Sequence, residues 1–406
     1  MDTRGFDLFT IGEIAILDKK INNSSYDFDF RNYFECRTVY DAVNCPVLLH
    51  IGAISDYAEV EKTVSDMGMY LLVTESEHLK SSMIEKWYPI LKEKTPYTVI
   101  YDELPEIDEI LTKFRFPIFI KGNRQTNRHK KSQCIINNVD EYEKLKQQWK
   151  HDEILSWQSV AVREFVKLKL IDDKSYPDMV PISYEFRFFC FEGKCVAYGN
   201  YWSIGNKYSL DESDKDTAKN LAQWAAQKLS LEFVAVDLAK TESGEWIIIE
   251  VNDAQESGFA GVNPYNLWSK VIEKCQNREW ISASELSNFS ILSGDPIPDK
   301  FLEQMKAMLY NVSDVRELIK IYIVLDEKVV FKEDEIYDFD EGTQEQIEAE
   351  ANFKKWFKLM KNAENRLIEY AKAEKMYIDD DIGLVKKLEP FMKKYGYRNV
   401  GGWWIK

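Results

Sequence analysis

Three polar side chains stand near the ends of two apolar runs in the middle of the chain. Asp237 lies in Ala-Val-Asp-Leu, and Glu250 and Asn252 lie in Ile-Ile-Glu-Val-Asn. Because side chains alternate along a strand, positions 250 and 252 share a face, and a hairpin through Gly244 would bring Asp237 to the same space. Two carboxylates and an amide oxygen are hard ligands suited to Mg²⁺ that carries nucleotide phosphates. Strand ends also carry Asp and Asn for structural reasons, but charges among Ile and Val are costly without a partner.

A basic segment lies about a hundred residues earlier. Lys121 ends the apolar run 116–121, so its stem would be buried and its ammonium would project into a cleft. The polar loop that follows contributes a glycine and further positive charges, namely Gly122, Arg124, Arg128, Lys130 and Lys131. A flexible, positively charged loop is one way to hold a triphosphate, although such loops are also common as exposed segments.

Arg187 is the third candidate, in the expected strand 184–191. It shares a strand face with Glu185. Arg187 could stabilise charge on a phosphoryl group in transfer, or it could form a simple ion pair with Glu185.

Periodicity and turn residues indicate the elements that position these side chains. The expected strands cover residues 47–51, 69–73, 116–121, 132–136, 159–166, 184–191, 195–201, 233–238 and 246–251. The expected helices cover residues 57–66, 104–114, 210–229 and a segment that ends near 150, with Asn138 as its N-cap and Glu141 at the capping-box position.

Composition limits the function further. A net charge of −16 disfavours bulk nucleic-acid binding, because most of the surface would repel a phosphate backbone. The 6 cysteines include no Cys-x-x-Cys pair, which gives a zinc site little support and fits a reducing compartment. No run approaches the roughly 20 apolar residues of a membrane span, and the first residues contain no apolar signal core. We therefore expect a soluble, cytoplasmic protein.

The order of these motifs resembles the ATP-grasp superfamily. The series FPIFIK, VAVREFV, YEFRFF-x-FEGK and VAVDLAKTESGEWIIIEVN occurs between residues 97 and 275. The segment 163–166 and the spacing from Asp237 to Glu250 and Asn252 are most similar to the divergent R-two-K clade. That clade includes the eukaryotic cell-division-cycle protein associated with translation-factor assembly.

The resemblance implies a role for each matching residue. Lys121 would contact the α- and β-phosphates of ATP, with Asn123 and Arg124 beside it. The main chain of Glu164, Phe165 and Val166, after Arg163, would meet the adenine edge. Arg187 would lie at the γ-phosphate, and Mg²⁺ would bind to Asp237, Glu250 and Asn252. This sequence has Gly-Asn-Arg-Gln-Thr-Asn-Arg where the family has a glycine-rich cover loop. The closing motion of that loop therefore stays open, and so does the choice between Lys130 and Lys131 as the second phosphate lysine.

The reaction that the resemblance implies is carboxylate–amine ligation. The enzyme would form an acyl phosphate and ADP, and a protein or peptide is one possible acceptor. The alternative is an ATP-binding assembly factor that grips a partner without ligation. A nucleotidyltransferase is a third class, but its lysine motif needs an acidic residue where Asn123 stands.

We predict an α/β and α+β protein of three domains. An N-terminal α/β domain covers residues 1–96, an ATP-grasp domain of two α+β subdomains covers 97–275, and a mainly helical extension covers 276–406. The extension contains an apolar stripe that either packs on its own core or docks a protein acceptor, formed by Phe353, Trp356, Phe357 and Met360.

Overall fold

The computed structural model describes the chain except for residues 1–4, 40–44, 55, 125–129, 173, 175, 205–206, 278–285, 287–288, 290–295, 313, 379–382, 402 and 406. Arg128 of the predicted basic loop lies outside the described residues. Two compact units are present. The first comprises residues 1–39, 47–61 and 72–277, and the second comprises 40–46, 62–71 and 278–406.

An N-terminal sheet opens the first unit. Its strands in this unit run in the order β3-β1-β2-β4, with bounds Arg37–Thr38, Phe6–Ile11, Ile14–Lys19 and Pro46–His50. The helices that follow are α1 (Tyr57–Asp66), α2 (Glu75–Ser82) and α3 (Ile84–Leu91). The predicted strand over 47–51 and the predicted helix over 57–66 are confirmed, and β5 (Tyr70–Leu71) lies in the predicted strand 69–73.

A second sheet carries Lys121. Its strand order is β6-β9-β7-β8, with bounds Thr98–Tyr101, Val160–Glu164, Ile118–Gly122 and Ile135–Ile136. Helices α4 (Ile107–Leu111) and α6 (Val139–Trp149) supply part of its core. The cap prediction is confirmed, because Oδ1 of Asn138 accepts from the main-chain N–H of Glu141 at 3.0 Å.

The prediction of a strand over residues 132–136 is wrong for residues 132–134. Residues Lys131–Cys134 form the short helix α5, because the main-chain N–H groups of Gln133 and Cys134 both donate to the carbonyl of Lys130. Only β8 is extended.

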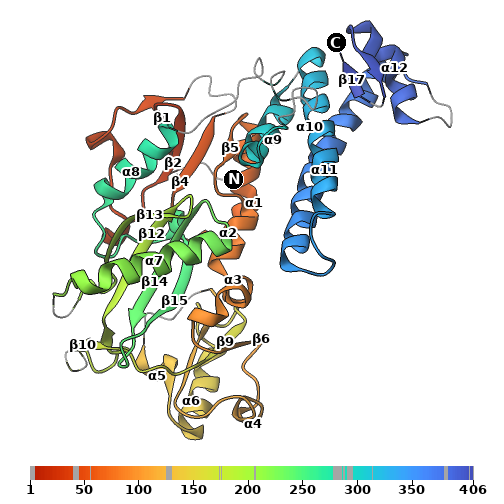
Figure 1. The fold of residues 1–406 in the computed structure, drawn as a ribbon. Helices are drawn as coiled ribbons and strands as arrows, with labels where there is room; N and C mark the ends of the chain where they lie inside the picture. The colour runs from red at the N-terminus through yellow and green to blue at the C-terminus, as the bar shows by residue number, and fades with distance from the viewer. Residues whose placement is uncertain are drawn as a thin grey trace. The chain divides into compact units, whose positions relative to one another are not determined.

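A third, antiparallel sheet carries the other candidate residues. Its order is β13-β12-β14-β15, with bounds Lys194–Asn200, Glu185–Phe191, Phe233–Lys240 and Trp246–Asp253. Helix α7 (Glu212–Leu229) lies across one face of the sheet (Figure 1), where its alanines pack on Phe186, Phe188, Val234 and Val236. Side chains at alternate positions therefore point to the opposite face, which holds the candidate site.

A β-bulge in β15 sets which side chains reach that face. Asp237 of β14 pairs with Glu250, but the next residue, Leu238, pairs with Ile248, so Ile249 is the extra residue. The alternation of β15 changes phase at this point. As a result Ile247 and Ile249 point away from α7, and so do Glu250 and Asn252, while Ile248 and Val251 enter the core.

The first unit also contains β10 (Leu170–Asp172), β11 (Ile182–Ser183) and α8 (Pro264–Gln276). The second unit is mainly helical. It contains α9 (Leu302–Asn311), α10 (Val315–Ile336), α11 (Gln344–Ala373), α12 (Leu384–Lys394) and a hairpin of β16 (Arg398–Val400) with β17 (Trp403–Ile405).

The apolar stripe of α11 packs largely on the core of its own unit. Trp356 and Met360 are buried in that core and Phe353 packs against it, while Phe357 remains 40% exposed. None of the described helices combines the length and the apolar character that crossing a membrane requires.

Candidate functional site

An apolar pocket lies between the second and third sheets of the first unit. Phe119 and Ile135 line it from one sheet, and Ile247 and Ile249 from the other. The predicted segment Arg163, Glu164, Phe165 and Val166 forms part of its wall. The pocket is lined mostly by apolar side chains, as a site for an aromatic base requires, and its charged residues are Lys121, Arg163, Glu164, Glu185 and Glu250.

Lys121 and Glu250 meet across the two sheets. The Nζ of Lys121 donates to Oε1 of Glu250 at 2.5 Å, and the lysine side chain is only 3% exposed. The apolar strand β7 therefore delivers the lysine into the site, as the sequence predicts. A buried pair of this kind is stable only while each charge has a partner.

Arg187 and Asp237 form a second, deeper pair. The guanidinium donates from Nε to Oδ1 at 2.8 Å and from Nη2 to Oδ2 at 2.7 Å. Its third donor, Nη1, bonds the carbonyl of Gly258 at 2.8 Å, and the ring of Tyr201 lies 5.1 Å away. Burial raises the pKa of the Asp237 carboxyl, while the charge of Arg187 opposes that shift. The ion pair of Arg187 thus forms with Asp237 and not with Glu185.

Glu185 lies beside this pair without joining it. Its Oε2 accepts from the Ser183 hydroxyl at 2.9 Å. Burial, followed by the charge of Asp237, raises the pKa of Glu185 to about 8. This raised pKa favours the protonated carboxyl at a higher pH than is usual for glutamate.

The protein engages the Arg163 guanidinium and the side-chain oxygen of Asn123, whereas the buried Nδ2 of Asn123 has no hydrogen-bond partner among the described residues. The Arg163 guanidinium donates to Thr98 Oγ1 at 3.1 Å, to Thr95 Oγ1 at 2.6 Å and to the carbonyl of Ile249 at 2.7 Å. Burial lowers its pKa to about 10. Oδ1 of Asn123 accepts from the main-chain N–H of Glu85 at 3.1 Å, near the start of α3. Both residues position the walls of the pocket, and their direct contact with a nucleotide stays a prediction.

Arg124 points into a different, polar pocket. This second pocket shares Tyr201 and Glu250 with the apolar pocket, and it is also lined by Asn23, Tyr26, Arg124, Arg187, Asn252, Asp253, Glu256 and Ser257. The two pockets thus meet at Tyr201 and Glu250. Asn252, one of the predicted metal ligands, faces the polar side of this junction.

The predicted magnesium ligands share one face of β14 and β15, and their chemistry fits a hard cation. However, Asp237 is fully buried and both its oxygens accept from Arg187, while Glu250 accepts from Lys121. Among the described residues, no group of three or more His, Cys, Asp or Glu side chains is arranged to hold a metal. These three side chains can therefore hold Mg²⁺ only if Lys121 and Arg187 leave the carboxylates and pair with phosphate oxygens instead.

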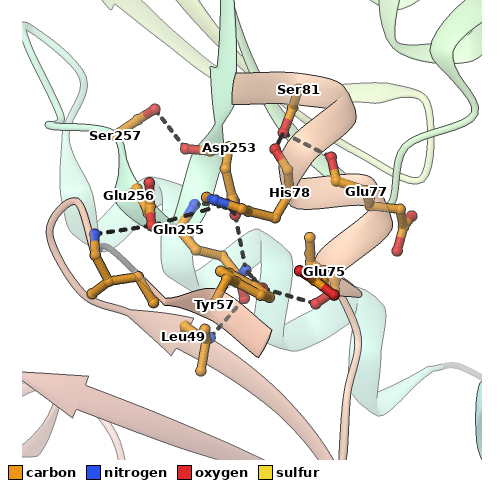
Figure 2. Close-up of polar contacts among 12 residues, drawn as sticks. Leu49, Tyr57, Glu75, Glu77, His78, Ser81, Asp253, Gln255, Glu256 and Ser257 are labelled. Atoms are coloured by element: carbon orange, nitrogen blue, oxygen red, sulfur yellow. Dashed lines mark hydrogen bonds and ion pairs between the residues drawn. The ribbon is translucent and has the colours of Figure 1, made fainter. Parts of the chain in front are cut away.

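Sequence reasoning missed His78, Asp253 and Glu256. They form a polar network beside the second pocket (Figure 2). Nδ1 of His78 lies 3.0 Å from Oδ2 of Asp253, and its ring stacks on Tyr57 with centroids 4.2 Å apart. Asp253 directly follows the Glu-x-Asn motif and Glu256 lies in the turn after it, so the motif was the available signal for both. Nothing near His78 in the sequence marked that residue.

Several solved structures are similar to this chain. A D-Ala:D-Ser ligase from Enterococcus faecalis is 15% identical with a TM-score of 0.39, and the match covers 56% of this chain and 68% of that one. A D-alanine–D-alanine ligase from Bacillus anthracis complexed with ATP is 17% identical with a TM-score of 0.41, covering 58% and 81%. A RimK-domain ATP-grasp protein from Sphaerobacter thermophilus is 12% identical with a TM-score of 0.39, covering 57% and 78%.

The family comparison is based on sequence. Residues 109–271 match the model of the ATP-grasp domain of the R-two-K clade, family 3. None of the curated proteins matches the chain. The matched segment begins in α4 and ends in α8, so it includes all of the second and third sheets except β6, and it contains every predicted site residue. The expected resemblance to the ATP-grasp fold and to its R-two-K clade is confirmed for residues 109–271.

Proposed function

Because the chain contains an ATP-grasp domain of the R-two-K clade, we propose that it is an ATP- and Mg²⁺-dependent ligase that joins a carboxylate to an amine. One observation carries the proposal. Lys121 and Glu250 form a buried ion pair at the point where an apolar, base-sized pocket meets a polar one. That junction is where a nucleotide would place its phosphates and a second substrate would meet them.

The apolar pocket would hold the adenine. Hydrogen bonds to the base would come from the main chain of Phe165 and Val166, because the N–H of Glu164 already donates to the carbonyl of Tyr97 at 2.8 Å. The protonated carboxyl of Glu185 would donate to a nucleotide oxygen or ring nitrogen.

The phosphates would be bound by an exchange of ion-pair partners. Lys121 would leave Glu250 for a phosphate oxygen, and the freed carboxylate would become a metal ligand with Asn252. Arg187 would exchange Asp237 for the γ-phosphate in the same way, which would release the third predicted ligand. Mg²⁺ supplies charge neutralisation between the phosphates when it is bound.

The reaction would then proceed in two steps. A carboxylate oxygen attacks the γ-phosphorus, the bond from that phosphorus to the bridging oxygen breaks, and ADP leaves. The ammonium of the second substrate loses one proton, and the resulting amine attacks the acyl carbon. The carbon–nitrogen bond forms as the carbon–oxygen bond to phosphate breaks, and the second nitrogen proton leaves with the phosphate. Arg187 would hold the phosphoryl charge in the first step.

A turnover experiment tests the proposal. The full chain is incubated with Mg·ATP and a small-molecule extract of cells, and nucleotides and adducts are followed by mass spectrometry. ADP, phosphate and a product lighter by one water than its two precursors would support ligation. AMP formation would indicate adenylyl transfer, and bound ATP without any ADP would favour a non-ligating gripping function.

A further inference from the structure

The polar pocket lies next to the junction and is built from the N-terminal sheet region as well as from the ATP-grasp domain. Asn23 and Tyr26 contribute from the first region, and Arg124, Asp253 and Glu256 from the second. Because it shares Glu250 and Tyr201 with the apolar pocket, a molecule bound here lies within reach of the transferred phosphoryl group.

Arg124 is held in a fixed orientation at this pocket. Its Nη2 lies 2.7 Å from Nε2 of His78. A guanidinium only donates hydrogen bonds, so Nε2 accepts and the ring proton resides on Nδ1, where it donates to Asp253. The His78 ring is 1% exposed, and its Nδ1 lies near both Asp253 and Glu256 (Figure 2). The buried side chains of His78 and Asp253 thus fix the orientation of Arg124.

Glu256 supplies the opposite charge. Its Oε1 accepts from the main-chain N–H of Ile54 at 3.2 Å, and its Oε2 lies 3.9 Å from Nη2 of Arg124. That separation is longer than a hydrogen bond. Within the described part of the chain, the two groups face each other without a direct hydrogen bond, so both retain capacity for a ligand.

We propose that the polar pocket binds an α-amino acid as one substrate of the ligase, with its carboxylate on Arg124 and its ammonium on Glu256. The inference rests on the proposed ligase function. An α-amino acid carries its two charges on neighbouring groups, and it would pair both protein charges at once. A neutral substrate would form no ion pair with Arg124 or Glu256, whose side chains are 19% and 9% exposed, and a dianion would meet the carboxylates of Asp253 and Glu256.

The first experiment uses the full chain, Mg·ATP and the twenty standard L-amino acids, singly and in pairs, with ADP formation as the readout. At least one free amino acid raises the rate, while its carboxamide and its N-acetyl derivative do not. If the carboxamide or the N-acetyl derivative stimulated ADP formation as strongly as the free amino acid, the proposed pairing of its carboxylate with Arg124 and its ammonium with Glu256 would be overturned.

Variants then test the residues. Arg124→Gln raises the KM for the stimulating amino acid at least about 30-fold, the loss of one charged hydrogen-bonded partner. Arg124→Lys keeps the charge but not the planar fork, so its KM lies between those of the wild type and Arg124→Gln. The exposed Lys86→Gln on α3 is the matched control and leaves the KM unchanged. An unchanged KM in Arg124→Gln, with the melting temperature retained, would contradict the proposal.

His78 is a positioning residue, and a pair of substitutions tests that role. His78→Phe keeps a ring on Tyr57 but cannot accept from Arg124, so the KM for the amino acid rises while kcat stays within about twofold. His78→Gln restores an acceptor oxygen and recovers part of the KM. A loss of kcat equal in both variants would mean that the ring has only a structural role.

Binding of the nonhydrolysable analogue AMPPNP with Mg²⁺ separates this inference from the function on which it rests. If the analogue binds in a Lys121-dependent manner but no amino acid stimulates ADP formation or stabilises the complex, the inference fails and the nucleotide site stands. If the analogue does not bind, the proposed function itself fails.

Discussion

The Nζ of Lys121 lies 2.5 Å from Oε1 of Glu250, and this contact joins a strand of the second sheet to a strand of the third. The pair sits at the junction of the two pockets. Its charges are neutralised before any nucleotide arrives. Under the proposed function, binding of Mg·ATP would therefore require an exchange of partners and not the creation of new charge in the site.

Lys121→Ala should weaken Mg·ATP binding by about 2–5 kcal/mol, because a desolvated phosphate partner is lost. Isothermal titration with AMPPNP measures the change. Lys86→Ala, an exposed lysine on α3, controls for the loss of charge. Unchanged affinity in Lys121→Ala would exclude the proposed phosphate site.

Asp237→Asn and Glu250→Gln should separate folding from metal binding. Asp237→Asn leaves the buried Arg187 without its charge partner and should lower the free energy of unfolding by about 3–5 kcal/mol. Glu250, which is 16% exposed, should tolerate Gln with a smaller loss of stability but should lose the Mg²⁺ dependence of nucleotide binding. Urea unfolding and titration with and without Mg²⁺ measure the two effects. Equal destabilisation by both changes, with Mg²⁺ dependence retained, would make both carboxylates structural.

Arg187→Lys should retain nucleotide binding while phosphoryl transfer falls sharply. Lysine keeps the charge but cannot form the two parallel bonds that the guanidinium makes with Asp237 or would make with a phosphoryl group. The single-turnover rate of ADP formation, compared with the Kd for AMPPNP, is the measurement. A parallel loss of rate and affinity would identify Arg187 as a general ATP contact.

Glu185→Gln should flatten the dependence of stability on pH. Glu185 has a raised pKa of about 8 against an ordinary value of 4.5, so between these values the folded chain holds a proton that the unfolded chain has lost. Its stabilisation is present below pH 4.5 and is lost as pH rises through 8, a change on the order of 4–5 kcal/mol. The variant should still lose some stability as pH rises, because the pKa of Glu256 is also raised, to about 7.

Urea unfolding of the wild type and of Glu185→Gln at about pH 5 and about pH 8 gives the comparison. Glu143→Gln, at an exposed position on α6, is the control. An identical slope in Glu185→Gln and wild type would mean that Glu185 is ionised in the folded protein.

Much of the third sheet could be predicted because its signals are local. Alternation and the Gly244 turn predict β14 and β15, and the register brings Asp237 opposite Glu250 as expected. The bulge at Ile249 could not be predicted, since the run Ile-Ile-Ile gives no indication of the position at which the side-chain alternation changes phase.

The orientation of the Arg124 side chain could not be predicted either, because it depends on a contact with His78, which lies 46 residues away in the sequence. The partner of Arg187 was missed for the same reason: it lies 50 residues further along the chain.

Arg163 has a consequence for how the nucleotide enters. Its guanidinium holds β9 to the carbonyl of Ile249 in β15, and it also ties both to the segment that carries Thr95 and Thr98. The two sheets therefore cannot separate by translation without breaking these buried bonds, which are costly to leave unmade. The motion that admits ATP should be a rotation whose axis passes close to Arg163. The rim at the polar pocket would then swing furthest, while residues 164–166, which we propose bind the adenine, would stay nearly still.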